Sequence, residues 1–185
     1  MDKAANTHST TRGRYGMKPR LEEKPKRKKE RTMHTHSPGV FETTLQKTNV
    51  WLREISDFLH WNDYQKAYHG LRAVLHTLRD RLPVPEAAHL GAQLPMLIRG
   101  IYYEDWRPAA TPVKTKTTQE FYDIVKEHFK ADQNVNPMRL TTAVMEVLAA
   151  NLSLGEVEKL RGIMPLHLRE IWPEQEKPID LSECI

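Results

Sequence analysis

Apolar side chains recur at helical spacing along most of the chain beyond residue 43. Trp51, Ile55 and Leu59 share one stripe, and longer stripes run through 71–82 and 140–152. Residues three and four apart lie on one face of a helix, so these stripes predict amphipathic helices. No alternating apolar run of useful length and no Asn-Gly or Asp-Gly turn favours a strand. The pattern therefore predicts an all-α fold.

The stretch 73–102 is repeated seventy residues later, at 143–172. Nine of its thirty positions are identical, where chance at ordinary composition would give about two. The identical pairs are Ala73/Ala143, Val74/Val144, Leu78/Leu148, Leu82/Leu152, Glu86/Glu156, Leu90/Leu160, Pro95/Pro165, Arg99/Arg169 and Ile101/Ile171. We therefore expect a tandem duplication of a four-helix unit, giving about eight helices in one bundle. The two units are expected to pack face to face around a pseudo-twofold axis.

Helix-start signals mark corresponding points in both halves. Thr or Ser followed three residues later by Gln or Glu is typical of a capping box. Such pairs are Thr43/Gln46, Thr117/Glu120 and Ser153/Glu156. We expect the first helix to begin near Thr43, the second to follow Asp63, and the copy of the second to open at Asn136-Pro137.

Two prolines divide what would otherwise be one long helix in each half. A proline inside a helix removes a hydrogen bond and clashes with the preceding turn. Pro95 and Pro165 therefore predict a bend followed by a short fourth helix, over 95–103 in the first half and 165–172 in the second. The segment 109–116 lacks an apolar period and is expected to link the halves.

Composition and charge separate a helical body from a tail. Only 39% of the residues are hydrophobic, which is low for a globular chain. Residues 1–40 hold eleven Lys and Arg against four acidic residues, whereas the rest of the chain is slightly acidic. We expect a disordered basic tail over 1–39, helical repeats over 40–109 and 110–173, and a polar C-terminal tail over 174–185 that extends from the body.

The densest basic run suggests a function for the tail. Lys and Arg side chains near phosphate groups release counterions and so bind polyanions. The candidate nucleic-acid-binding residues are Lys24, Lys26, Arg27, Lys28, Lys29 and Arg31. The alternative is a solubilising tail that binds polyanions weakly and without selection.

Cysteine usage and hydropathy indicate a cytoplasmic protein. Cys184 is the only cysteine, so no disulfide can form within the chain, which fits a reducing compartment. No apolar run approaches the ~18 residues that span a bilayer. Residues 1–39 lack the apolar core of a secretory signal. We expect no membrane span.

Charged residues that recur in both halves are the natural candidates for a site. They are the pairs Glu86/Glu156 and Arg99/Arg169. One interpretation places them around a shared anion or metal ion. The interpretation we favour is structural: each Glu, in a first helical turn, satisfies backbone N–H groups, and each Arg bonds that Glu or helix-end carbonyls.

The histidines do not recur. Charged residues occupy the matching positions in the second half; the pairs are His60/Lys130, His69/Arg139, His76/Glu146 and His89/Lys159. Exchange for charged residues indicates exposed positions, so we predict no metal site. No Gly-rich phosphate loop occurs, and no motif surrounds Cys184. No catalytic or cofactor-binding residue is therefore predicted.

Several of these motifs resemble a known family. They are Leu71-Arg-Ala-Val-Leu75, Leu78-Arg-Asp-Arg-Leu82, Glu86-Ala-Ala, Gln93-Leu-Pro-x-Leu-Ile-Arg-Gly-Ile-Tyr-Tyr-Glu-Asp-Trp106, Ala143-Val-Met, Gly155-Glu156, Met164-Pro165 and Leu168-Arg-Glu-Ile-Trp172. They are similar to the pattern of domain of unknown function 2267 over about 40–173. The resemblance implies a small helical protein from bacteria or archaea. The family carries no established activity, so it supplies no catalytic residue, and the basic tail lies outside its pattern.

Three functions remain open at this point. The first is a non-enzymatic interaction module that binds a protein partner or itself. The second is a nucleic-acid-associated protein that uses the basic tail. The third is an enzyme or carrier with a small-ligand pocket between the repeats. Trp61 and Tyr64 are expected in an interhelical turn, where large aromatic residues either mark a contact surface or pack over a helix end.

Overall fold

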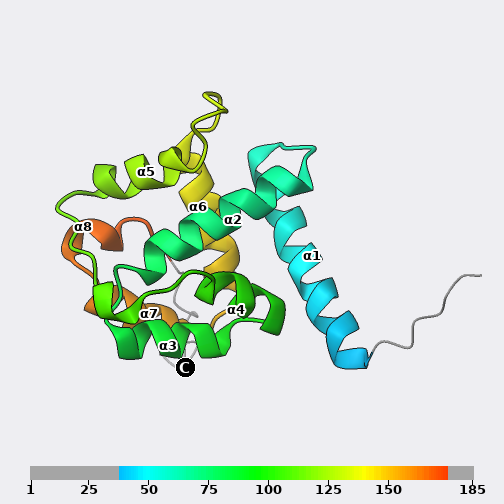
Figure 1. Ribbon diagram of the computed structural model, residues 1–185, viewed down its shortest axis with the longest axis horizontal. Coiled ribbons are helices and arrows are strands. Elements are labelled where there is room, and N and C mark those ends of the chain that lie inside the picture. Colours follow the sequence, from blue (N-terminus) through cyan, green and yellow to red (C-terminus); the bar gives the residue numbers. More distant parts are fainter. Residues whose placement is uncertain (1–37, 175–185) are drawn as a thin grey trace, which may run out of the picture. The chain divides into compact units, whose positions relative to one another are not determined.

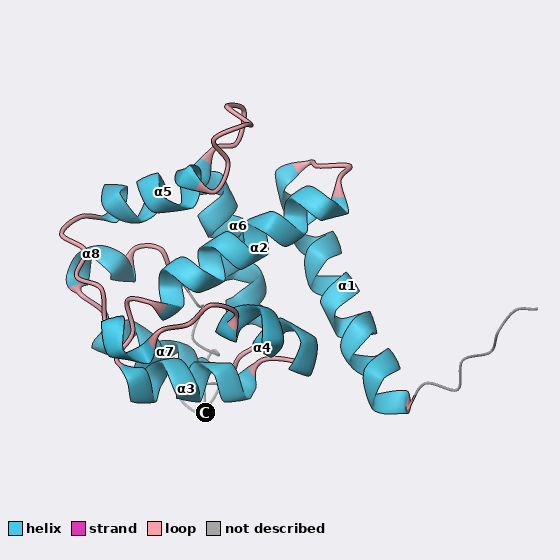
Figure 2. Ribbon diagram, in the orientation of Figure 1, coloured by secondary structure: helices cyan, strands magenta, loops and turns pink. Residues whose placement is uncertain are grey.

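The computed structural model describes residues 38–174, and all regular structure within that range is helical (Figures 1 and 2). The elements are α1 (Gly39–Leu59), α2 (Tyr64–Arg79), α3 (Val84–Gln93), α4 (Met96–Tyr103), the 3-10 helix η1 (Pro108–Ala110), α5 (Thr118–Glu127), α6 (Pro137–Ala150), α7 (Leu154–Ile163) and α8 (Leu166–Arg169). This order confirms the predicted all-α class. The segments 1–37 and 175–185, with the predicted tails, lie outside the described residues.

Two helices, α2 and α6, supply the centre of the hydrophobic core. Leu71, Leu75 and Leu78 of α2 are fully buried, as are Leu140 and Met145 of α6. The helix α1 packs against both of them, and α5 does the same from another side (Figure 1). A helix buried on most of its circumference is expected at the centre of a bundle.

Side-chain caps start four of the helices at the places the sequence predicts. Asp63 accepts a hydrogen bond from the Lys66 amide, and Asn136 accepts one from the Arg139 amide. The same bond forms at α5, from the Glu120 amide to Thr117, and at α7, from the Glu156 amide to Ser153. Each cap satisfies an amide that the first turn of a helix leaves unpaired.

The prediction that the first helix begins near Thr43 is wrong by one turn. The helix α1 begins at Gly39, after Pro38, with no side-chain cap. The Thr43 hydroxyl donates instead to the Gly39 carbonyl, 2.8 Å away inside the helix. A threonine hydroxyl can bond the backbone one turn earlier as readily as it caps a helix, so the capping-box spacing misleads here.

Both predicted proline bends are present. Pro95 separates α3 from α4, and Pro165 separates α7 from α8. The helix α4 fills the expected span, but α8 ends at Arg169 rather than at residue 172. Pro173 disfavours helical geometry at Trp172, so the helix cannot extend to that residue.

Candidate functional site

The structure describes some of the predicted site residues and not others. The six basic residues proposed for nucleic-acid binding lie outside the described range; they are Lys24, Lys26, Arg27, Lys28, Lys29 and Arg31. Cys184 also lies outside it. The repeated Glu and Arg pairs lie within it. Among residues 38–174, no three His, Cys, Asp or Glu side chains gather in a way that could hold a metal ion.

One of the two repeated glutamates forms an ion pair with a lysine of α7. Glu86 and Glu156 occupy the first turns of α3 and α7. Glu86 Oε2 lies 2.9 Å from Nζ of Lys159, a residue of α7. The hydrogen bond with Glu86 raises the pKa of Lys159, and the charge of Glu156 acts in the same direction. The ion pair of Glu86 and Lys159 therefore ties α3 to α7.

The repeated arginines both bond the carbonyl before the proline bend. Arg169 Nε donates to the Met164 carbonyl at 3.1 Å, and Arg169 Nη2 donates to the Gly162 carbonyl at 3.0 Å. Arg99 makes one longer contact, 3.4 Å from Nη2 to the Leu94 carbonyl, and is exposed. Arg169 is thus engaged twice at its corner, whereas Arg99 is exposed and has one long contact among the described residues.

Two buried side chains of α2 hold the end of α4. Arg79 Nη1 donates to the carbonyls of Tyr102 and Glu104, the latter at 2.9 Å. His76 Nε2 lies 2.6 Å from the Ile101 carbonyl. These carbonyls belong to the last turn of α4, where a helix leaves its acceptors unpaired. The pair therefore satisfies the end of α4 inside the protein.

The prediction that His76 is exposed is wrong, although His60, His69 and His89 are exposed as expected. Only 8% of the His76 surface is accessible, and this burial lowers its pKa. The bond to the Ile101 carbonyl requires a proton on Nε2 and opposes the shift. Glu146, at the matching position of the second half, is exposed. Comparing the two halves in the sequence therefore does not reveal that His76 is buried.

A cavity of about 380 Å³ lies between α2 and α5. Arg79 and Arg81 are among its lining residues and both are buried. Arg81 Nη1 donates to the Thr77 carbonyl and Nε to the Thr115 hydroxyl, each at 2.6 Å. The buried guanidinium groups of this cavity are therefore already engaged within the protein.

A second hollow, here called the α1–α4 groove, runs between α1 and the corner that joins α3 to α4. Its volume is about 520 Å³. From α1 it is lined by Gln46, Lys47 and Val50, and from the corner by Met96 and Arg99. Lys47 and Arg99 are both exposed. The groove thus has apolar walls and two accessible cations.

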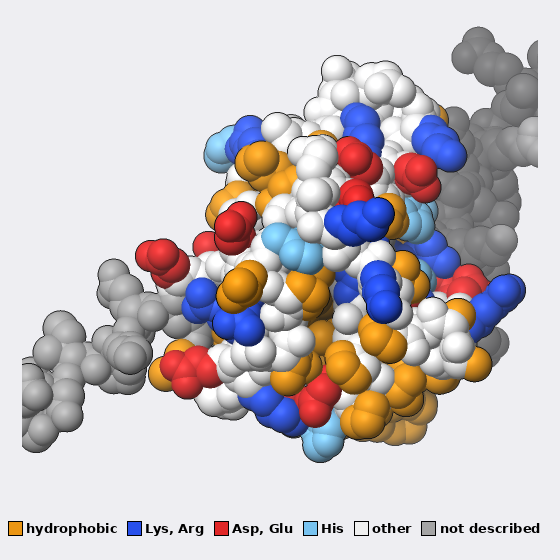
Figure 3. Space-filling view, turned by 90° about the vertical axis from the view of Figure 1, so that its left-hand side faces the viewer, with side chains coloured by type: hydrophobic (Ala, Val, Ile, Leu, Met, Phe, Trp, Pro, Cys, Tyr) orange, Lys and Arg blue, Asp and Glu red, His pale blue; other side chains and the backbone are white. Residues whose placement is uncertain are grey.

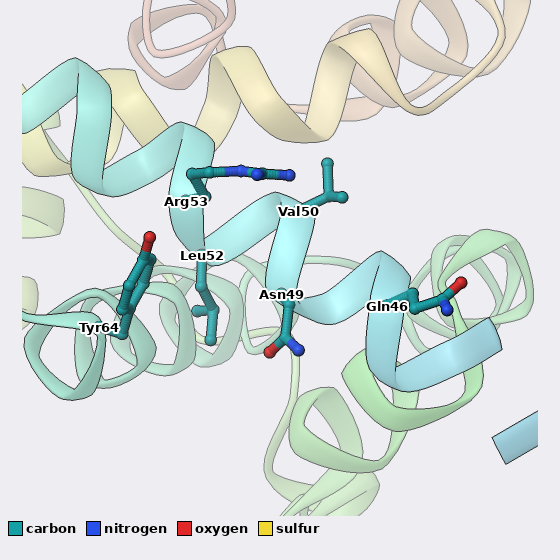
Figure 4. A pocket seen from close by; sticks show the side chains of 6 residues that line it. All are labelled: Gln46, Asn49, Val50, Leu52, Arg53 and Tyr64. Carbon is teal, nitrogen blue, oxygen red and sulfur yellow. The ribbon is translucent and has the colours of Figure 1, made fainter. Parts of the chain in front are cut away.

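The Tyr64 depression adjoins this groove and shares Gln46 and Val50 with it. It has a volume of about 700 Å³. Figure 4 shows Asn49 and Leu52 on one side of α1, Val50 and Arg53 on the other, and Tyr64 reaching toward them from α2. The sequence placed Tyr64 in an interhelical turn; it is the first residue of α2 and is exposed.

The charge of these two hollows has one sign. In the part of the chain that the structure describes, the charged residues that line them are Lys47, Arg53 and Arg99, and none is acidic. On the face that carries α5 and α8, by contrast, Lys and Arg are interspersed with Asp and Glu (Figure 3). A peptide with acidic side chains therefore meets favourable charge at α1.

The first nine residues of α1, 39–47, are here called the α1 extension. Val40, Phe41 and Leu45 in it are 58%, 51% and 53% exposed. The extension is joined to α4 by one hydrogen bond, from the Leu97 amide to the Thr44 hydroxyl at 2.9 Å. The helix α5 begins at Thr118, seventy residues beyond Thr48, so no α-helix covers 109–117, the positions that match the extension.

Comparison with known protein families identifies the family of the helical body beyond the α1 extension. A family model described as "Uncharacterized conserved protein (DUF2267)" matches residues 48–171, well over half of the chain. The chain belongs to this family. No curated protein matches the chain. The match begins inside α1, so it includes α2 to α8 and leaves out the α1 extension. No helix within residues 38–174 is both long enough and apolar enough to cross a membrane.

Proposed function

We propose that this chain is a non-enzymatic helical interaction module that binds a protein partner, or a second copy of itself, through α1. The observation that carries the proposal is the α1 extension, where Val40, Phe41 and Leu45 are more than half exposed. Contiguous apolar side chains left in solvent are typical of interaction surfaces. The adjoining α1–α4 groove and Tyr64 depression widen this surface and add cations to it.

The helical geometry of α1 supports the same conclusion. Ile55 and Trp51 face the core and are buried. Phe41, Thr44 and Thr48 continue toward the N-terminus on the same side of the helix at spacings of three and four. Thr44 and Thr48 are buried, whereas Phe41 is not. The apolar side of α1 therefore extends past the part of the core that covers it, which suits a partner surface.

We further propose that the two halves are a tandem duplication about a pseudo-twofold axis. The helices α3 and α7 begin and end seventy residues apart. A Cβ atom at Gly70 would lie 2.6 Å from Cδ1 of Leu140, the residue seventy positions later. Equivalent positions touch one another where a twofold axis passes between them. The α1 extension is then an addition to one copy of the repeat.

Two other functions have narrower support. Nucleic-acid binding rests on the basic residues between Lys24 and Arg31 and on their phosphate affinity. A small-ligand carrier is favoured by the cavity of about 380 Å³ between α2 and α5, which lies within the usual range of ligand sites. The internal bonds of Arg79 and Arg81 weigh against the carrier, because they leave fewer donors for a ligand.

The test introduces a charge into the α1 extension of the full chain. Phe41→Asp combined with Leu45→Asp should abolish self-association in sedimentation velocity, or remove the partner that the wild-type chain retains from its native lysate. Leu166→Asp is the matched control, because Leu166 is 75% exposed on α8 in the second half. Both variants should keep the far-ultraviolet circular dichroism of the wild type.

The outcomes separate the hypotheses. Loss with the α1 variant and not with Leu166→Asp supports the module. Association or partner retention that survives the α1 variant contradicts it. Retention that disappears on nuclease treatment and is indifferent to both variants favours the nucleic-acid function of the tail.

A further inference from the structure

We infer that the α1–α4 groove binds the chain's own C-terminal segment, residues 175–185, so that the proposed interaction surface is partly covered by the same molecule. The inference rests on the proposed function, since it assigns an occupant to the cationic part of that surface. A partner that binds this surface then has to displace the segment from α1, so the segment and the partner compete for the same site.

Charge is the first argument. Among residues 38–174, the groove and the Tyr64 depression are lined by Lys47, Arg53 and Arg99 and by no Asp or Glu. Residues 175–185 contain three acids against one lysine; they are Glu176, Asp180, Glu183 and Lys177. The other segment outside the described residues is strongly basic and would be repelled by these cations. Of the two, only the C-terminal segment is complementary to the groove.

The second argument is the state of Arg99. In the matched position of the second half, Arg169 uses two nitrogens on two carbonyls. Among the described residues, Arg99 makes a single hydrogen bond of 3.4 Å, which leaves N–H donors of its guanidinium for a carboxylate. Arginine and carboxylate form paired hydrogen bonds with good geometry. An acidic side chain of the segment can therefore accept hydrogen bonds from the Arg99 guanidinium.

The third argument is apolar content and length. Asp180 lies between Ile179 and Leu181, so the segment places apolar side chains beside an acidic one, as the groove places apolar side chains beside cations. Met96 and Val50 are 43% and 37% exposed there. An extended chain of eleven residues spans about 36–40 Å, which is close to the width of a compact domain of this length. Reach from Glu174 is therefore sufficient.

Cys184 provides the test, because it is the only cysteine of the full chain. A nitroxide spin label on Cys184 broadens the amide signals of nearby residues in the nuclear magnetic resonance spectrum. Docking predicts broadening at Val50, Met96 and Leu97, which line or border the groove, and none at Gln133 in the loop before α6. Moving the label, with Cys184→Ser and Ser182→Cys, should give the same pattern.

Charge reversal sharpens the test. Lys47→Glu with Arg99→Glu should remove the broadening, and adding Asp180→Lys with Glu183→Lys should restore it. Lys130→Glu, an exposed lysine beside the loop before α6, is the control and should leave the pattern unchanged. The same label on a second, isotopically unlabelled chain should broaden nothing at low concentration.

Absence of broadening at the groove with either label position would overturn the inference, and so would broadening that arises only between chains. These results are independent of the Phe41 and Leu45 experiment. If the spin label gives no broadening at the groove while the Phe41 and Leu45 variant behaves as expected, docking of the C-terminal segment is excluded and the interaction module stands. If the broadening appears while the Phe41 and Leu45 variant has no effect, the interaction module is excluded and only an intramolecular contact remains.

Discussion

The corner between α3 and α4 and the corner between α7 and α8 share one backbone and have different surroundings. Pro95 and Pro165 have φ, ψ of −53°, 145° and −52°, 145°. The preceding residues, Leu94 and Met164, have −77°, 144° and −75°, 149°. Proline restricts its own φ and the conformation of the residue before it, so a short local sequence is enough to set this bend.

Side-chain partners are where the corners differ. At the second corner, Thr118 of α5 donates to the His167 carbonyl and Arg169 bonds two further carbonyls. At the first corner, Thr44 of the α1 extension accepts from the Leu97 amide, and Arg99 is exposed. Local sequence determines the bend, whereas the contacts around each arginine differ between the two corners.

The largest expected effect concerns the first half alone. Arg79→Met should lower the free energy of unfolding by about 3 kcal/mol, because it leaves the buried carbonyl acceptors at the end of α4 unpaired. Chemical denaturation monitored by circular dichroism measures this. In the second half, Ala149 stands at the matching position and α8 is a single turn.

Arg139→Met is the matched control for this change. Arg139 is exposed in the first turn of α6, so the same substitution there should stay within ~0.5 kcal/mol of wild type. An equal loss of stability in both variants would show that Arg79 does not hold α4.

A smaller effect is expected at the proposed pseudo-twofold axis. Gly70→Ala should lower stability by about 1 kcal/mol, since the new methyl group meets the fully buried Leu140 side chain. In a Leu140→Ala background the same change should be neutral or stabilising, because the space is then free and alanine favours the helix. A double-mutant cycle measures the coupling. Equal effects in both backgrounds would contradict the close approach of the two equivalent positions.

The smallest effect is a pH dependence of the His76 contact. Burial lowers the pKa of His76 in the folded chain; the nearby charges of Arg79 and Arg72 act in the same direction, and Asp80 opposes them. As the pH falls, the unfolded chain therefore binds the proton first. The contribution of neutral His76 to the free energy of unfolding is complete above about pH 6.5 and is lost as the pH falls below that value. His76→Gln keeps an N–H donor and should show a shallower decline in stability between about pH 7 and pH 5. Identical slopes in the two proteins would contradict this role.

Much of the fold follows from local signals that can be recognised in the sequence. The caps at Asp63, Thr117, Asn136 and Ser153 act within one helical turn, so their spacing predicts them. The start of α1 was missed because Thr43 bonds the backbone inside a helix, a choice that spacing alone does not reveal. Pro173 keeps Trp172 out of helical geometry, so α8 ends before that residue.

The candidate surface was far less predictable. Its parts come from α1, from the α3–α4 corner and from Tyr64, and only the packing of these elements brings them together. The burial of His76 likewise depends on where α4 ends. Repetition in the sequence singled out Arg99 and Arg169 as a pair, but it gave no means to tell the exposed member from the engaged one.

The most direct test of the account compares Arg99→Ala with Arg169→Ala in the full, spin-labelled chain. The account predicts that Arg169→Ala lowers the free energy of unfolding by about 1–2 kcal/mol, through two lost hydrogen bonds, and leaves the broadening at Val50 and Met96 unchanged. Arg99→Ala should stay within ~0.5 kcal/mol of wild type and weaken that broadening. Equal losses of stability with no change in broadening for either variant would contradict the division between a binding corner and a structural one.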